Sequence, residues 1–272
     1  MIADWDDAYN NMDYIPGGAE WPDRWAAAAA AFRTTCAPET FRPGLAYGSH
    51  PREGTDLFLP DGQPAGLVVF VHGGYWLRFD RDYWSHLAAG LLKRGWAVAM
   101  PSYPLAPEAR IAEITRSACA AIEAAAASVS GPLVLAGHSA GGHLVTRQVC
   151  TDTGLTPATL ARLRRVVPIS GVSDLRPLMA TALNATLRLD AAEAAAESPA
   201  LLAPIPGVRV TAWVGGAERP EFVRQNALLA NIWTGLGADM VEVVVPGRHH
   251  FDILDALADP ASELVEALVG EV

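Results

Sequence analysis

The sequence predicts an α/β protein with a mostly parallel central sheet and helices on both faces of that sheet. Short β-rich runs alternate along the chain with Ala- and Leu-rich segments of helical length, as in folds of this class. Several of the runs are almost continuously apolar, which is typical of strands buried on both faces. The chain has 272 residues, of which 51% are hydrophobic and 18% charged. We therefore expect a single domain over residues 1–272 with a large core of its own.

The predicted strands each end at a turn or in a loop that contains Gly or Pro. In chain order they are Thr55–Leu59, Gly66–Val71, Ala97–Pro101, Leu133–Ala136, Val166–Ile169, Val208–Val214 and Met240–Val245. The segments between them have the length and the apolar spacing of helices. These predicted helices are Tyr83–Leu92, Ile111–Ala127, Gly142–Thr151, Glu221–Leu236 and Ser262–Leu268.

Two segments fit this alternation poorly. The first is an N-terminal extension over about residues 1–45, and the second is an insertion over about residues 174–206 that contains helix-like pieces. In α/β enzymes, excursions at strand ends build a wall or lid over a site at the carboxyl ends of the strands. We expect both segments to serve the single domain in this way, the second as a small cap.

Composition and charge exclude several classes of function. Thirty acidic and 20 basic residues give a formal net charge of -10 without any Lys- or Arg-rich run, which argues against nucleic-acid and anionic-membrane partners. No apolar stretch approaches the ~20 residues of a membrane-spanning helix, and the first residues are acidic where a signal peptide is basic. The cysteines Cys36, Cys119 and Cys150 lack zinc-site spacing. We expect a soluble cytoplasmic protein without metal or cofactor; the oligomeric state is left open, with a homodimer as one option.

A candidate nucleophile lies in the Gly-His-Ser-Ala-Gly string of residues 137–141. The string directly follows an apolar strand and directly precedes a helical pattern, which is where a sharp turn holds a serine clear of the sheet. Glycines on both sides remove side chains that would clash in so tight a turn. The context therefore predicts that Ser139 is a nucleophile.

A second string, His-Gly-Gly-Tyr-Trp at residues 72–76, follows another buried strand about 65 residues ahead of that serine. Glycines at such a place let backbone N–H groups approach an oxygen that becomes negative during acyl transfer. We predict an oxyanion hole formed by the N–H groups of Gly74, Tyr75 and Ala140. His72 precedes the nucleophile and adjoins the glycines, so we expect it to hold the loop rather than to act as a base.

A general base is expected after the last strand, where His249 and His250 stand side by side. Four carboxylates at strand ends are candidates for the acid of a triad, and we expect the three that are not the acid to lie on the surface. Position favours Glu218, in the loop after the strand that precedes the base's own strand. Asp174 remains the rival. The four candidates are Asp174, Glu218, Glu221 and Asp239.

Together these strings resemble the kynurenine formamidase (arylformamidase) branch of the α/β hydrolases, neighbours of the hormone-sensitive-lipase-like carboxylesterases. The resemblance runs from the Tyr-Asn-Asn of residues 9–11 to His250 and includes residues 137–144, 170–175 and 250–252, with His-Gly-Gly-x-Trp as its most specific part. It implies the α/β-hydrolase fold and assigns the base to His250, leaving His249 as an exposed neighbour. It also assigns the acid to Glu218, where the family has Asp.

The resulting hypothesis is a serine hydrolase that forms an acyl-enzyme on Ser139, with His250 as base and Glu218 orienting it. It would cleave small carboxylic esters, aryl formamides or both. The alternatives are a dedicated N-formyl-kynurenine formamidase of tryptophan catabolism and, more remotely, a binding protein without catalysis. Tyr75 and Trp76 are expected to contact the substrate, with Trp21 and Trp25 as further candidates; core packing is the competing explanation for the tryptophans. No charged pair for an amino-acid head group is identified.

Overall fold

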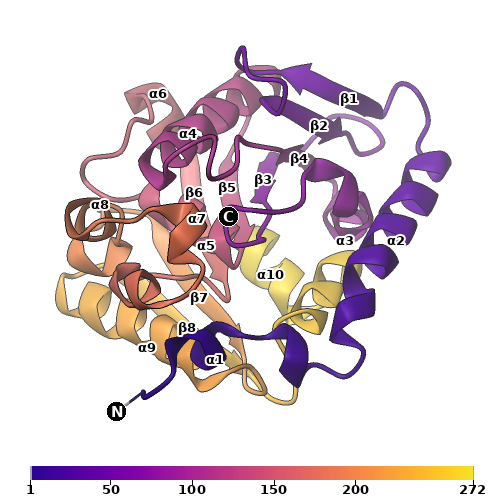
Figure 1. Cartoon of the computed structure of the whole chain (residues 1–272). Coiled ribbons are helices and arrows are strands. Elements are labelled where there is room, and N and C mark those ends of the chain that lie inside the picture. Colours follow the sequence, from indigo (N-terminus) through magenta and orange to yellow (C-terminus); the bar gives the residue numbers. More distant parts are fainter. Residues whose placement is uncertain (1, 272) are drawn as a thin grey trace.

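An eight-stranded sheet forms the centre of the structure (Figure 1). This computed structural model describes residues 2–271. The strands follow the order β1-β2-β4-β3-β5-β6-β7-β8, in which β2 runs antiparallel to β1 and β4 and every other pair of neighbours is parallel. The predicted α/β fold with a mostly parallel sheet is therefore confirmed. The strands are β1 (Phe41–Ala46), β2 (Gly54–Phe58), β3 (Leu67–Val71), β4 (Ala97–Pro101), β5 (Leu133–His138), β6 (Leu163–Ile169), β7 (Arg209–Gly215) and β8 (Asp239–Val245).

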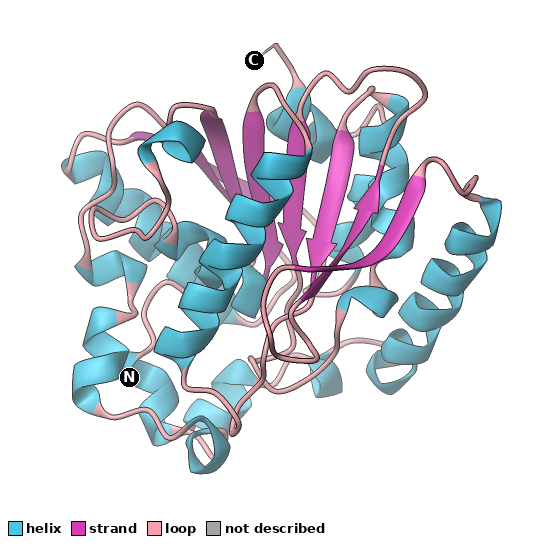
Figure 2. Cartoon of the chain, turned by 90° about the horizontal axis from the view of Figure 1, so that it is seen from above, coloured by secondary structure: helices cyan, strands magenta, loops and turns pink. Residues whose placement is uncertain are grey.

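Helices lie on both faces of this sheet (Figure 2). The α-helices are α1 (Trp5–Tyr9), α2 (Trp21–Thr35), α3 (Ala89–Lys93), α4 (Ile111–Ser128), α5 (Ala140–Arg147), α6 (Pro157–Leu160), α7 (Asn184–Leu187), α8 (Ala191–Ala196), α9 (Pro220–Gly235) and α10 (Glu263–Val269). Short 3-10 helices occupy Met12–Tyr14, Gly18–Glu20, Arg81–Tyr83, Ser85–Ala88, Arg176–Ala180, Pro199–Leu201 and Asp252–Ala258. None of the helices within residues 2–271 has the length and apolarity needed to cross a membrane.

Each central strand contributes to two cores, because alternate side chains point to opposite faces of a sheet. In β3, Leu67 and Val69 pack in one core with side chains of α4, α5 and α9. Val68 and Phe70 pack in the other with side chains of α2, α3 and α10. Both faces are covered, which is why these strands read as continuous apolar runs rather than as an alternation.

The carboxyl ends of four parallel strands bring the candidate residues to one edge of the sheet. β3 ends immediately before the string of residues 72–76, and β5 ends at the residue before Ser139. β7 ends three residues before Glu218, and β8 is followed by the loop that carries His250. In open α/β sheets, ligands bind outside the carboxyl ends of the strands. The fold therefore gathers residues that lie far apart along the chain.

The N-terminal extension is shorter and more regular than predicted. It contains α2, and residues 41–46 belong to the sheet as the edge strand β1 rather than to an extension that ends near Leu45. β1 was not predicted because Pro43 and Gly44 interrupt the apolar pattern, and its pairing with β2 is irregular between Arg42 and Leu45. An exposed edge strand also carries little apolar signal.

Two of the predicted helices have other bounds. The segment predicted as Tyr83–Leu92 consists of 3-10 turns followed by the short helix α3. The segment predicted as Gly142–Thr151 begins earlier and ends earlier, as α5. The glycines at the start of α5 lower helix propensity, so its first turn was not predicted. Close packing nevertheless requires glycine at position 141. A Cβ atom on Gly141 would lie 1.9 Å from the carbonyl oxygen of Val71.

Candidate active site

Ser139 sits in a strained turn between β5 and α5. Its backbone has φ 55° and ψ -115°, a conformation that a residue with a side chain rarely adopts. The N–H of Ser139 donates to the carbonyl oxygen of Ile169 on β6 at 2.8 Å, which anchors the turn to the sheet. Gly137 permits the turn to close, since a Cβ atom there would lie 2.2 Å from the Gly141 carbonyl oxygen. The local sequence thus accounts for the turn that presents the serine.

The structure brings His250 and Glu218 into direct contact. The Nδ1 atom of His250 lies 2.5 Å from the Oε2 atom of Glu218. Because a carboxylate only accepts hydrogen bonds, the Nδ1–H donates and Nε2 is left without a proton on a neutral imidazole. Both residues are buried. This pair therefore fixes the tautomer that a general base requires.

The Glu218 carboxylate is held by two further donors. The hydroxyl of Ser170 donates to Oε1 at 2.5 Å, and the N–H of Gly215 donates to the same oxygen at 2.8 Å. Gly215 is the last residue of β7, and Ser170 directly follows β6. Three donors around one buried carboxylate compensate for its removal from water and keep it aimed at His250.

The other three candidate acids make no hydrogen bond to His250. Two of them are buried, although the sequence predicted surface positions for all three. Asp174 is buried and pairs with Arg176, from Oδ1 to Nε at 2.9 Å. Burial raises the pKa of Asp174, but the bonds from Arg176 outweigh burial and hold that pKa below its usual value. Glu221 is also buried, where it accepts from the Tyr9 hydroxyl at 2.9 Å. Only Asp239 is exposed, in an ion pair with a neighbouring strand residue.

His249 is half-buried, not exposed as the sequence predicted. Its Nδ1 accepts the N–H groups of Phe251 and Asp252, both at 3.1 Å. Its ring meets the edge of Trp21, with the ring centroids 5.3 Å apart. His249 therefore shapes the loop, while the neighbouring His250 is the histidine that faces Glu218.

The loop after β3 has an unusual backbone. Gly74, Tyr75 and Trp76 all have positive φ, of 110°, 53° and 58°. Within residues 2–271, the N–H groups of Gly74, Tyr75 and Ala140 make no hydrogen bond. The hydroxyl of Tyr75 donates to the carbonyl oxygen of Tyr9, which ties this strained loop to the N-terminal segment. Gly74 and Tyr75 line the same cavity as Ser139, and Ala140 directly follows the serine in the chain.

Trp76 and His72 face away from the site. Trp76 is fully buried against the ring of His143 and is not part of the cavity wall, so its predicted contact with substrate does not fit the structure. The positive φ of Trp76 turns its side chain into the core, where it packs with other buried side chains. His72 stacks on Tyr103 with ring centroids 4.4 Å apart, and its Nδ1 lies 2.7 Å from the Gly73 carbonyl oxygen. Burial lowers the pKa of His72 to about 4, so it stays neutral.

A cavity of about 540 Å³ opens in front of Ser139 and His250, both of which line it. Such a volume is usual for a small-molecule site. Gly74 and Tyr75 line the cavity as well. Much of the remaining wall is aromatic. Trp21 and Trp25 were further candidates for contact with the substrate, and of these two only Trp25 belongs to the wall. The aromatic residues of the wall are Tyr9, Trp25, Tyr75, Phe79, Trp84 and Phe251.

Both segments that fitted the alternation poorly contribute to this wall. The N-terminal segment supplies Asp6 and Asp13, and the 174–206 insertion supplies Leu183. The N–H of Ala182 donates to the Asp6 carboxylate at 2.6 Å, so the two segments contact each other. Arg78, just after the strained loop, also lines the cavity. These charged residues were not predicted as part of the site, because nothing in their local pattern distinguishes them from residues of a solvated surface.

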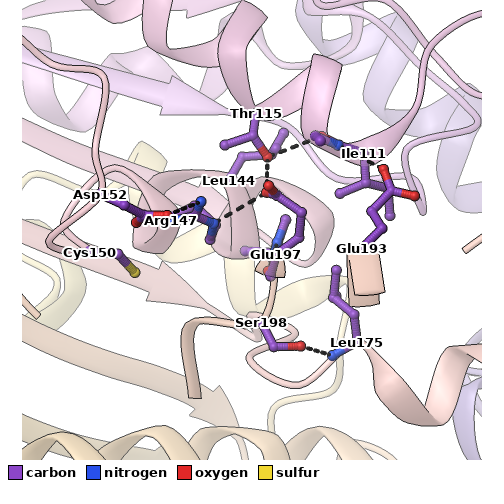
Figure 3. A network of polar contacts seen from close by, with 12 residues as sticks. Ile111, Thr115, Leu144, Arg147, Cys150, Asp152, Leu175, Glu193, Glu197 and Ser198 are labelled. Carbon is purple, nitrogen blue, oxygen red and sulfur yellow. Dashed lines mark hydrogen bonds and ion pairs between the residues drawn. The ribbon is translucent and has the colours of Figure 1, made fainter. Parts of the chain in front are cut away.

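The insertion is anchored to the body of the protein by a buried polar network (Figure 3). The Glu197 carboxylate accepts from the Thr115 hydroxyl of α4 at 2.7 Å and from Nε of Arg147 in α5 at 3.2 Å. The neighbouring Ser198 hydroxyl accepts the N–H of Leu175 at 2.8 Å. The network therefore joins the insertion to α5, the helix that begins directly after Ser139. Within residues 2–271, no three His, Cys, Asp or Glu side chains converge as a metal site requires.

Comparisons with known proteins extend over most of the chain. A model of the alpha/beta hydrolase family matches residues 68–270, which include Ser139 and His250. Kynurenine formamidase of Danio rerio is 28% identical over 234 residues, or 82% of this chain and 79% of that protein. A crystal structure from Silicibacter sp. TM1040, provisionally described as a thioesterase, is 51% identical with a TM-score of 0.92 and covers 97% of this chain and 98% of that one. An esterase of Pyrobaculum calidifontis, 17% identical, shares the fold with a TM-score of 0.68 and coverage of 90% and 89%.

Proposed function

The chain belongs to the alpha/beta hydrolase family, and on this premise we propose that it cleaves small carboxylic esters and aryl formamides through an acyl-enzyme on Ser139. One observation carries the proposal. Ser139 and His250 line the same cavity, while the His250 imidazole is bonded to the buried carboxylate of Glu218. A nucleophile, a base with a fixed tautomer and an orienting carboxylate are the parts that serine-type acyl transfer requires.

The reaction would proceed in two steps. His250 takes the proton of the Ser139 hydroxyl as its oxygen attacks the substrate carbonyl, and Glu218 stabilises the imidazolium that forms. The N–H groups of Gly74, Tyr75 and Ala140 are free to donate to the oxygen that becomes negative. His250 then returns the proton to the leaving alcohol or amine, and water hydrolyses the acyl-enzyme by the same route.

The cavity supports substrates with a small acyl group and an aromatic leaving group. Its aromatic wall could pack against a flat ring, and formyl or acetyl groups need little room beside the serine. Arg78 and the carboxylates of Asp6 and Asp13 favour the second candidate, a dedicated N-formyl-kynurenine formamidase. Such a substrate has a carboxylate and an ammonium group, and these residues could bind them. Kynurenine formamidases among the relatives support the same candidate.

Two variants and three substrates test the proposal. Ser139→Ala should abolish labelling by an aryl phosphonate and lower turnover by several orders of magnitude while the fold persists. Retention of turnover in this variant would refute the acyl-enzyme. The relative kcat/KM for p-nitrophenyl acetate, formanilide and N-formyl-kynurenine separates the two candidates. A dedicated formamidase should prefer N-formyl-kynurenine over formanilide by ~10²-fold or more, and Arg78→Ala should remove most of that preference without changing hydrolysis of the neutral ester.

We also propose a cytoplasmic location. Cys36, Cys119 and Cys150 are free thiols, and the cytosol keeps thiols reduced. Fractionation of the source cells, followed by immunodetection, tests this location. Recovery of the protein outside the cytosolic fraction would contradict it.

A further inference from the structure

His138, the residue directly before Ser139, contacts the loop that carries the proposed base. Its Nε2 atom lies 2.8 Å from the backbone carbonyl oxygen of His250, and the two rings have their centroids 4.6 Å apart. A carbonyl oxygen only accepts hydrogen bonds, so Nε2 of His138 must carry the proton. His138 is 3% exposed. The bond is therefore shielded from water and formed by one defined tautomer.

The state of His138 excludes it as a competing base. Burial, together with the nearby His250, lowers the pKa of His138 well below its ordinary value, so the ring stays neutral. With the proton on Nε2, the other ring nitrogen is an acceptor, and Nδ1 has no partner among the described residues. Nδ1 of His138 faces Gly73. A Cβ atom added to Gly73 would lie 3.1 Å from this nitrogen. The ring is thus enclosed between the loop of the base and the loop of the proposed oxyanion hole.

The His250 carbonyl has no other donor within residues 2–271. Glu218 holds the imidazole of His250 at Nδ1, and His138 holds its backbone. The first contact fixes the direction of the imidazole, and the second fixes the backbone from which the imidazole extends. The proposed proton transfer from Ser139 depends on the direction of Nε2.

We propose that His138 is a positioning residue for the general base, acting through its hydrogen bond to the His250 carbonyl. The inference rests on the proposed function, in which His250 takes the proton of Ser139. His138 also lines the cavity beside Ser139 and His250, but the role proposed here depends on its bond to the His250 backbone. It keeps the base within reach of the serine hydroxyl, and small displacements of such groups reduce rates sharply.

The test uses three substitutions at one position in the full-length protein. The amide nitrogen of Gln can reach the place of Nε2, whereas the shorter Asn reaches only the place of Nδ1 and Leu has no donor. We expect His138→Leu and His138→Asn to lower kcat for p-nitrophenyl acetate by ~10- to 100-fold with little change in KM. His138→Gln should recover kcat to within about fivefold of the unmodified protein. Circular dichroism melts identify any variant that does not fold, and the Gln and Asn pair decides the result if the Leu variant fails.

The outcomes separate this inference from the proposed function. Equal losses in the Gln and Asn variants would overturn the inference, as would a folded Asn or Leu variant with unchanged kcat. Ser139→Ala is assayed in the same series. If Ser139→Ala retains turnover, the proposed function fails; if it is inactive while His138→Asn is unimpaired, only the positioning role of His138 fails.

Discussion

The substitution Glu218→Gln tests the proposed site most directly, because it changes one atom of a well-defined contact. In the structure, Oε1 of Glu218 accepts from Ser170 and Gly215, and Oε2 accepts from Nδ1 of His250. A Gln side chain can keep its oxygen on the first two donors, which turns its NH₂ group toward Nδ1. Nδ1 must then accept, so the imidazole proton moves to Nε2. A base with a proton already on Nε2 cannot take one from Ser139.

The expected magnitude is that of a wrong tautomer in a triad, a loss of ~10⁴ in kcat. At 1.36 kcal/mol for each factor of ten, the loss corresponds to about 5.4 kcal/mol of transition-state stabilisation. The assay is steady-state hydrolysis of p-nitrophenyl acetate, with circular dichroism to verify folding. Asp174→Asn is the matched control, since Asp174 is a buried carboxylate that pairs with Arg176 instead. A folded Glu218→Gln variant within tenfold of the unmodified kcat would refute the reasoning, and loss of activity in the control would move the acid to Asp174.

Three further predictions follow from neighbouring contacts. His250→Ala should lower kcat/KM by ~10⁴ or more and His249→Ala by less than about tenfold, because His249 only accepts loop N–H groups; similar losses in the two would contradict the assignment. Glu197→Ala should lower the free energy of unfolding by about 3 kcal/mol in urea titrations, because it removes a carboxylate that pairs with the buried Arg147, and a loss below about 1 kcal/mol would count against the network as an anchor. The pKa of His72 is about 4 when folded, so below pH ~6.5 the unfolded chain binds a proton that the folded chain does not. The contribution of this residue should therefore lower the free energy of unfolding by ~1.4 kcal/mol for each unit by which the pH falls between ~6.5 and 4. Midpoints of urea unfolding that do not change from pH 7 to pH 5 would contradict this.

Features that depend on neighbours in the chain were predictable from the sequence. The strands buried on both faces appear as apolar runs, and their bounds were predicted to within a few residues except for β1. The turn at Ser139 was recognised because a strand, two glycines and a helix have to follow one another there. The pairing of Glu218 with His250 was favoured by chain order in the fold, since each follows its own parallel strand. The comparisons with known proteins confirm the resemblance to kynurenine formamidases and esterases.

Features that depend on contacts between distant residues were decided only by the tertiary structure. Tyr9 bonds to Glu221, 212 positions away, and no local pattern encodes such a pair. The same holds for the charged residues of the cavity wall, which look like ordinary surface residues until the N-terminal segment is folded over the site. Trp76 shows the converse: the string that contains it is local, but the direction of its side chain follows from a backbone with φ 58° and from the core that receives it. Local sequence sets periodicity and turn geometry, whereas the packing of segments remote in the chain decides which side chains meet.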